Sequence, residues 1–273
     1  MRNIRMTIAY DGTDFHGWQR QKNALTVQEV LEDTLETLTK VPTPVVGAGR
    51  TDAGVHALRY TCNFRTDCAI PAEKVPFALN ALLPDGISVL DAQEVDFDFH
   101  SRFSAIGKHY RYRVLNTRYP DPFERNRAFF YPQELDLEKM RTAAKDLLGT
   151  HDFSAFCAAG ATTKTSVRTV YRAELTREGD IITLDIYGNG FLYNMVRIIM
   201  GTLIYVGNGK LPVHCIPDLI AEQKRKESGI TVPPQGLYFM EAYYDQESAP
   251  DFFGDFGSAD CGFCAGAVAP THQ

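Results

Sequence analysis

The sequence has no long apolar run, and this absence excludes the commonest membrane-directed classes of protein. The most apolar stretch, "IIMGTLIYV", is far shorter than the roughly 20 residues that a membrane-spanning helix needs. The first residues, "MRNIRMTIAYDG", contain no uninterrupted apolar segment of signal-peptide length. We therefore expect a soluble protein that works in the cytoplasm and has no membrane partner.

Cysteine is scarce and follows no framework. The six cysteines are scattered along 273 residues, whereas a disulfide-stapled or zinc-binding domain would show paired spacings. Only Cys261 and Cys264 form a C-x-x-C pair, and one such pair without a second is a weak metal or redox signal. We expect reduced thiols and no bound metal.

The chain also lacks a positive net charge, since its formal net charge at pH 7 is −6. The segment 246–273 contains four acidic residues and no lysine or arginine, so the remainder carries only −2. Between His100 and Arg127, seven basic residues stand against Asp121 and Glu124. Such a local basic patch is able to bind phosphates, although a run of charge is more often a solvated face.

What the chain does contain is a loop with three glycines, "GAGRTDAGVHA", from Gly47 to Ala57. It is not a dinucleotide fingerprint, because Asp52 stands where a third glycine or an alanine is required. It is not a phosphate-binding P-loop either, because Val55 and His56 follow Gly54. What remains is a single carboxylate, Asp52, with the guanidinium of Arg50 close to it in the sequence. Taken alone, capping a turn is the commoner role of an aspartate next to glycine.

Hydrophobic periodicity predicts an α+β fold in which strands and helices alternate twice along the chain. The segment 26–40 reads as a helix opened by a Thr26–Glu29 capping box. Two ferredoxin-like halves account for this order. We assign 1–105 to a first half with the glycine loop, 106–245 to a second half that completes a cleft, and 246–273 to a disordered tail.

Two further stretches bear on Asp52. Arg197 lies in a predicted helix that is apolar around most of its circumference, where a guanidinium needs an anionic partner. That partner is either in the same half or across a cleft. In the strand "KHYRYR", Lys108, Tyr110 and Tyr112 share one face, and His109, Arg111 and Arg113 share the other. Aromatic rings beside basic groups suit stacked bases and phosphates.

These stretches carry a resemblance to the TruA family of tRNA pseudouridine synthases, over about residues 4–244. The segments that match are ordered and mutually spaced. They are "AYDGTDFHGWQRQ", "GAGRTDAGVHA", "FHSRFSAIGKHYRYRV", "GNGFLYNMVRIIMGTL" and "PPQGLYFMEAYY". The family fold is two α+β halves whose antiparallel sheets join, with the active cleft between them. The tail after Asp245 departs from the family pattern.

The resemblance implies a role for each candidate residue. Asp52 would be the carboxylate that converts uridine to pseudouridine, and Arg197 would pair with it across the cleft. Arg50 would enter the RNA helix at the place of the extruded base, and Tyr110 would pack on the target uracil. Whether Asp52 attacks C6 or C1′, or acts through a glycal, stays open.

The same resemblance implies the substrate and the assembly. The substrate would be tRNA, modified at uridines 38, 39 and 40 of the anticodon stem-loop. Because the reaction is a redox-neutral isomerisation, no cofactor and no metal would be required. Relatives of this family act as homodimers, so a homodimer is expected.

Two alternatives belong to other classes. A non-catalytic RNA-binding protein would keep the basic patch and "KHYRYR" but would not need Asp52 opposite Arg197. A metal-dependent hydrolase could use "DFDFH", in which Asp96, Asp98 and His100 would share one face of a strand. That segment offers only three candidate ligands, and its alternation is an ordinary amphipathic strand pattern.

Overall fold

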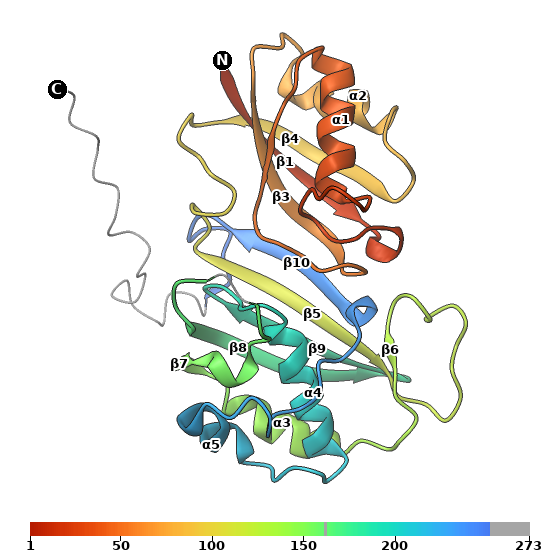
Figure 1. Cartoon of the computed structure of the whole chain (residues 1–273), viewed down its shortest axis with the longest axis vertical. Helices are drawn as coiled ribbons and strands as arrows, with labels where there is room; N and C mark the ends of the chain where they lie inside the picture. The colour runs from red at the N-terminus through yellow and green to blue at the C-terminus, as the bar shows by residue number, and fades with distance from the viewer. Residues whose placement is uncertain (161–162, 252–273) are drawn as a thin grey trace, which may run out of the picture.

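A ten-stranded β-sheet runs from one half of the chain into the other in the computed structural model, which describes residues 1–160 and 163–251 (Figure 1). The first half contributes β1 (Arg2–Tyr10), β2 (Val45–Gly47), β3 (His56–Thr66) and β4 (Ile87–Val95), with helices α1 (Val27–Thr39) and α2 (Val75–Asn80). The second half contributes β5 (Gly107–Leu115), β6 (Phe129–Phe130), β7 (Gly149–Asp152), β8 (Val167–Glu178), β9 (Ile181–Gly188) and β10 (Leu237–Tyr243). Its helices are α3 (Leu137–Lys145), α4 (Met195–Gly207) and α5 (Cys215–Glu222). Short 3₁₀ helices occur at Gly12–Asp14, Ala72–Lys74, Phe153–Phe156 and Pro234–Gly236.

Each half has the strand order of a ferredoxin-like unit. In the first half, β1 lies between β4 and β3, and β2 pairs with β3. In the second half, β5 lies between β10 and β9, and β8 follows β9. The helices α1 and α2 lie beside the strands of the first half, and α3, α4 and α5 beside those of the second (Figure 1). The predicted α+β class with two ferredoxin-like halves is confirmed.

The junction between the halves is parallel, although the pairs within each half are antiparallel apart from the short β5–β6 contact. Strand β10 pairs antiparallel with β5 and parallel with β3, where two residue pairs form the contact, Tyr238 with His56 and Phe239 with Ala57. The last strand thus lies in the middle of the sheet, between the two halves (Figure 1). This seam fixes the position of the glycine loop relative to α4.

The sequence pattern explains the helices that matter for the site. Helix α1 begins after Thr26, whose hydroxyl accepts a hydrogen bond from the backbone N–H of Glu29 (3.3 Å), so the cap was predicted correctly. Helix α4 is buried on nearly all sides, as its apolar circumference predicts. Only Arg197 and Tyr205 in it are partly exposed. No helix in the described part of the chain is both long and apolar enough to span a bilayer.

The prediction that "DFDFH" forms a strand face is wrong. Strand β4 ends at Val95, and the following residues form a turn in which the N–H of Phe99 donates to the carbonyl of Asp96 (3.0 Å). The buried amide of Asn3 donates to carbonyls of this turn, which holds it in a non-extended form. Among the described residues, no cluster of His, Cys, Asp and Glu has the arrangement of a metal site. The Cys261–Cys264 pair and the tail from residue 252 lie outside the described residues.

Candidate active site

The glycine loop connects β2 to β3 and is held by its own backbone. The N–H of Ala48 donates to the carbonyl of Thr61 (2.9 Å), and the N–H of Trp18 donates to the carbonyl of Thr51 (3.1 Å). The hydroxyl of Thr51 also shares a hydrogen bond with the buried Tyr10 hydroxyl (2.9 Å). The residue before Asp52 is therefore fixed on both its carbonyl and its side chain.

Glycine is required where this loop meets the segment 11–21. Gly17 has a φ of +85°, and a Cβ there would lie 2.4 Å from the carbonyl oxygen of Thr51. Gly54 has a φ of +77° and begins the return of the chain into β3. Part of the motif "AYDGTDFHGWQRQ" therefore supports the Asp52 loop, because the backbone at Gly17 and Trp18 packs against Thr51.

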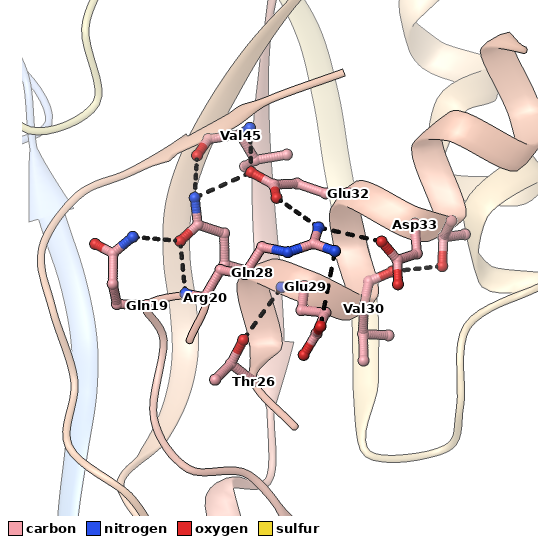
Figure 2. Close-up of polar contacts among 10 residues, drawn as sticks. Gln19, Arg20, Thr26, Gln28, Glu29, Val30, Glu32, Asp33 and Val45 are labelled. Atoms are coloured by element: carbon pink, nitrogen blue, oxygen red, sulfur yellow. Dashed lines mark hydrogen bonds and ion pairs between the residues drawn. The ribbon is translucent and has the colours of Figure 1, made fainter. Parts of the chain in front are cut away.

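The rim of the site next to this support is tied to α1 by a polar network (Figure 2). The guanidinium of Arg20 contacts carboxylates of Glu29, Glu32 and Asp33, at 3.0 Å for Glu32. The Gln28 side chain accepts from the backbone N–H of Arg20 (3.0 Å) and from the Gln19 amide (2.9 Å). Because Gln19 also lines the site, the network fixes the rim relative to the helix.

Asp52 and Arg197 meet across the two halves, 145 positions apart in the sequence. The Nη1 of Arg197 donates to Oδ2 of Asp52 at 3.0 Å. The side chains are 29% and 14% exposed, so the pair is largely shielded from water. Of the two partners that the sequence left open for Arg197, the structure has the one across the cleft.

Arg197 is also oriented by its own half. Its Nε donates to the carbonyl of Val232 (2.8 Å), and its Nη1 donates to Oδ1 of Asn194 (2.6 Å). Asn194 precedes α4 with a left-handed backbone (φ 61°), a conformation that asparagine tolerates better than most residues. Neither Asn194 nor Val232 was identified from the sequence as part of the site.

Only one oxygen of the Asp52 carboxylate is engaged. Within residues 1–160 and 163–251, the single side-chain hydrogen bond of Asp52 is the one from Arg197 to Oδ2. Oδ1 is left to react with a substrate or to accept a proton from it. A carboxylate held at one oxygen and open at the other is suited to nucleophilic attack or proton transfer.

Tyr110 lies on β5 with its ring between aromatic neighbours. Phe191 and Phe239 contact it edge to face, each with ring centroids 5.1 Å from the Tyr110 ring. Burial, and in second place the charge of Asp52, raises the pKa of the Tyr110 hydroxyl well above its usual range. Tyr110 therefore presents a neutral, fixed aromatic ring to the site.

A cavity of about 960 Å³ brings the predicted residues together. Asp52, Arg197, Tyr110 and Arg50 all line it, and its wall includes residues from both halves. This volume is at the upper end of the range for small-molecule sites. Arg50 is exposed and forms no hydrogen bond or ion pair within the described part of the chain, so it is free to contact a ligand.

Strand β5 divides its side chains between two environments, as the alternation predicted. Lys108 and Tyr110 line the cavity, and Tyr112 is buried in the core. On the opposite face, Arg111 forms a two-pronged contact with Asp185 (2.9 and 3.1 Å), and Arg113 pairs with Glu124 (3.0 Å). Those two arginines are neutralised by the protein itself.

The chain matches a known protein family over most of its length. Residues 6–104 and 143–245 match the family described as tRNA pseudouridine synthase. A tRNA pseudouridine synthase A from Acetivibrio thermocellus is 50% identical over 244 residues, which are 89% of this chain and 100% of that protein. One from Thermoanaerobacter sp. strain X514 is 48% identical over the same shares. In the solved structure of a Cbf5-Nop10-Gar1 complex, a chain resembles this one with a TM-score of 0.39 and 10% identity, over 86% of this chain and 48% of that one.

Proposed function

The chain belongs to the tRNA pseudouridine synthase family, and we propose that it isomerises uridines 38, 39 and 40 of the tRNA anticodon stem-loop, with Asp52 as the nucleophile. The observation that carries the proposal is the Asp52–Arg197 pair on the cavity wall, with one carboxylate oxygen open. Such a pair holds a carboxylate in a fixed position in a shielded site.

The chemistry requires no net oxidation or reduction. The C1′–N1 bond of uridine breaks, the base turns, a C1′–C5 bond forms, and the C5 proton is lost while N1 gains one. A carboxylate that adds covalently and later leaves divides this rearrangement into two easier steps. Attack at C6 and attack at C1′ both fit the open Oδ1, and the proposal rests on neither.

The base must leave the RNA stack to reach this carboxylate. Tyr110 would stack on the extruded uracil, since its ring lines the cavity and is held by Phe191 and Phe239. Arg50 would occupy the gap that the base leaves in the RNA, since its guanidinium has no partner in the described residues. Both roles place aromatic and basic groups where single-stranded nucleotides are usually bound.

We propose that the enzyme works as a homodimer in the cytoplasm, as the resemblance implies. The long, mostly exposed connection between β5 and β6 contains basic residues beside exposed rings, Tyr119 and Phe123 among them. Such a surface suits an RNA stem or a second subunit.

The test is tritium release from tRNA that carries C5-tritiated uridine, measured with and without a chelator. A pseudouridine synthase must release tritium as C5 loses its proton, and we expect the rate to survive chelation. A protein that binds tRNA but releases no tritium would be a non-catalytic RNA-binding protein. Release that stops on chelation and returns with added metal would point to a metal-dependent reaction.

A further inference from the structure

A second group of charges lies in the same cavity and has no part in the chemistry just described. Lys108 and Arg102 line this cavity. The Nζ of Lys108 donates to the carbonyl of Ala48 (2.8 Å), which is its only hydrogen bond among the described residues. Arg168, which is 8% exposed, donates to the carbonyls of Thr165 and Val167 and to no other group in the described part of the chain.

Arg102 and Arg168 both lie close enough to Lys108 for their charges to act on it. No acidic side chain in the described residues lies within ion-pair distance of Lys108, Arg102 or Arg168, whereas other cations of the same strand have such partners. Burial, and then the charges of Arg102 and Arg168, lowers the pKa of Lys108 to about 8. Arg168 is buried and Lys108 is partly buried, and positive charges that are shielded from water without an acidic partner are stabilised by a bound anion.

We propose that Lys108 and Arg102, with Arg168 behind them, form a subsite for the phosphodiester next to the target uridine. The inference rests on the proposed function, because it takes the ligand to be the RNA. Lys108 has three ammonium protons and uses one on Ala48, so two are left for phosphate oxygens. Arg102 is exposed and can move onto the same phosphate.

The position of the subsite defines which phosphate it would hold. Lys108 lies two residues before Tyr110 on β5, on the same face, about 7 Å along the strand. An ideal Cβ on Gly49 would lie 3.5 Å from the Lys108 ammonium, so the ammonium also abuts the loop that carries Asp52. With the uracil on Tyr110, a phosphate at Lys108 is one of the two linkages that flank the target nucleotide. Holding it would keep the extruded nucleotide in the cavity.

The experiment tests whether the charge of Lys108 acts on one particular phosphate of the RNA. Anticodon stem-loop RNAs would carry a single uncharged methylphosphonate at either flanking linkage, or at a remote linkage in the stem. Dissociation constants would be measured for wild type, Lys108→Met and the control Lys139→Met, whose lysine is exposed on α3 and pairs with Asp136. On unmodified RNA, we expect Lys108→Met to weaken binding about tenfold and to lower the salt slope by about one.

The decisive result is non-additivity. The methylphosphonate at one flanking linkage should weaken wild-type binding about as much as Lys108→Met does, with no further loss when the two are combined. Equal additional losses in both proteins, at both flanking linkages, would overturn the proposal and leave Lys108 as an anchor for Ala48. Arg102→Met provides a second variant that is safe for folding, because Arg102 is exposed, and it should couple to the same linkage.

These binding measurements separate the two proposals. If Lys108→Met and the methylphosphonate are non-additive but no tritium is released, the phosphate subsite is retained and the proposed isomerase activity is not. If tritium is released but the two changes are additive, the activity is retained and the subsite is not.

Discussion

Two groups of charges in the cavity differ in how they are paired. In the paired group, Arg197 donates to Asp52, and Arg197 is also held by the carbonyl of Val232 in its own half of the chain. In the cationic group, Lys108 and Arg102 have no acidic partner among the described residues. The paired group is suited to hold a carboxylate for the proposed reaction, and the cationic group leaves positive charge for a ligand. Whether a charged side chain has an oppositely charged partner therefore indicates its role better than the sign of its charge does.

The largest expected effect comes from removing the negative charge of the paired group. Asp52→Asn keeps the shape of the side chain and removes the proposed nucleophile, so tritium release should fall by more than about a thousandfold. The affinity for tRNA should stay within a few-fold, because the cationic group is untouched. Single-turnover kinetics and a binding titration on the same preparation check both statements. Turnover above roughly a thousandth of wild type would remove Asp52 from the mechanism.

Removing the other partner should have the next largest effect. Arg197→Met fits the apolar helix but leaves the carboxylate unpaired, so the single-turnover rate should fall on the order of a hundredfold. Arg197→Lys should recover only part of the loss, since an ammonium cannot serve Val232, Asn194 and Asp52 in one plane. A near-normal single-turnover rate in Arg197→Met would show that the pair is not catalytic.

A smaller effect is expected at Asn194, which orients Arg197. Asn194→Gly keeps the left-handed backbone and removes the acceptor, so the rate should fall about tenfold with little change in melting temperature. Asn194→Asp keeps an acceptor oxygen and should recover part of the rate. Asn194→Ala adds a backbone cost of about 1 kcal/mol to the loss. If Asn194→Gly has the wild-type rate and pH profile, Asn194 is only a helix cap.

The smallest effect concerns the cationic group and is measured as the pH dependence of RNA binding. Since the pKa of Lys108 is lowered to about 8, the free enzyme loses this charge as the pH rises through that value. The charged groups that face Lys108 are Arg102 and Arg168, and both keep their charge in this range. Affinity for the stem-loop should therefore weaken several-fold from about pH 7 to about pH 9. Lys108→Met should not show this change, and an equal pH dependence in both proteins would assign it to another group.

The sequence predicts those parts of the structure that depend on local pattern. The α1 cap, the alternation on β5 and the burial of α4 all follow from spacing, and each is confirmed. The polar turn at 96–100 was misread because its alternation resembles a strand, whereas a contact from Asn3, far away in sequence, decides its shape. Strand β7 ("GTHD") was not anticipated, because it has few residues of high β-propensity.

The site itself depends on long-range contacts that no local pattern contains. The apolar surroundings of Arg197 predict that it needs a partner, but they do not say which one. The partner lies 145 positions away, and only the family resemblance named Asp52 before the structure showed the contact. Asn194 lies three residues before Arg197, but it precedes α4 with a left-handed backbone, so helical spacing does not by itself predict its contact with the guanidinium. Val232 acts through its backbone carbonyl, which leaves no trace in the side-chain pattern.

The position of β10 has a consequence for the newly made chain. Strand β10 is the last strand that the structure describes, yet it fills the place between β3 and β5. Until residues 237–243 leave the ribosome, β3 and β5 each lack the pairing that β10 provides, and the seam that positions the Asp52 loop relative to α4 is not formed. The proposed site is therefore assembled only after β10 has been synthesised, and a chain truncated before β10 would expose two strand edges that are prone to aggregation.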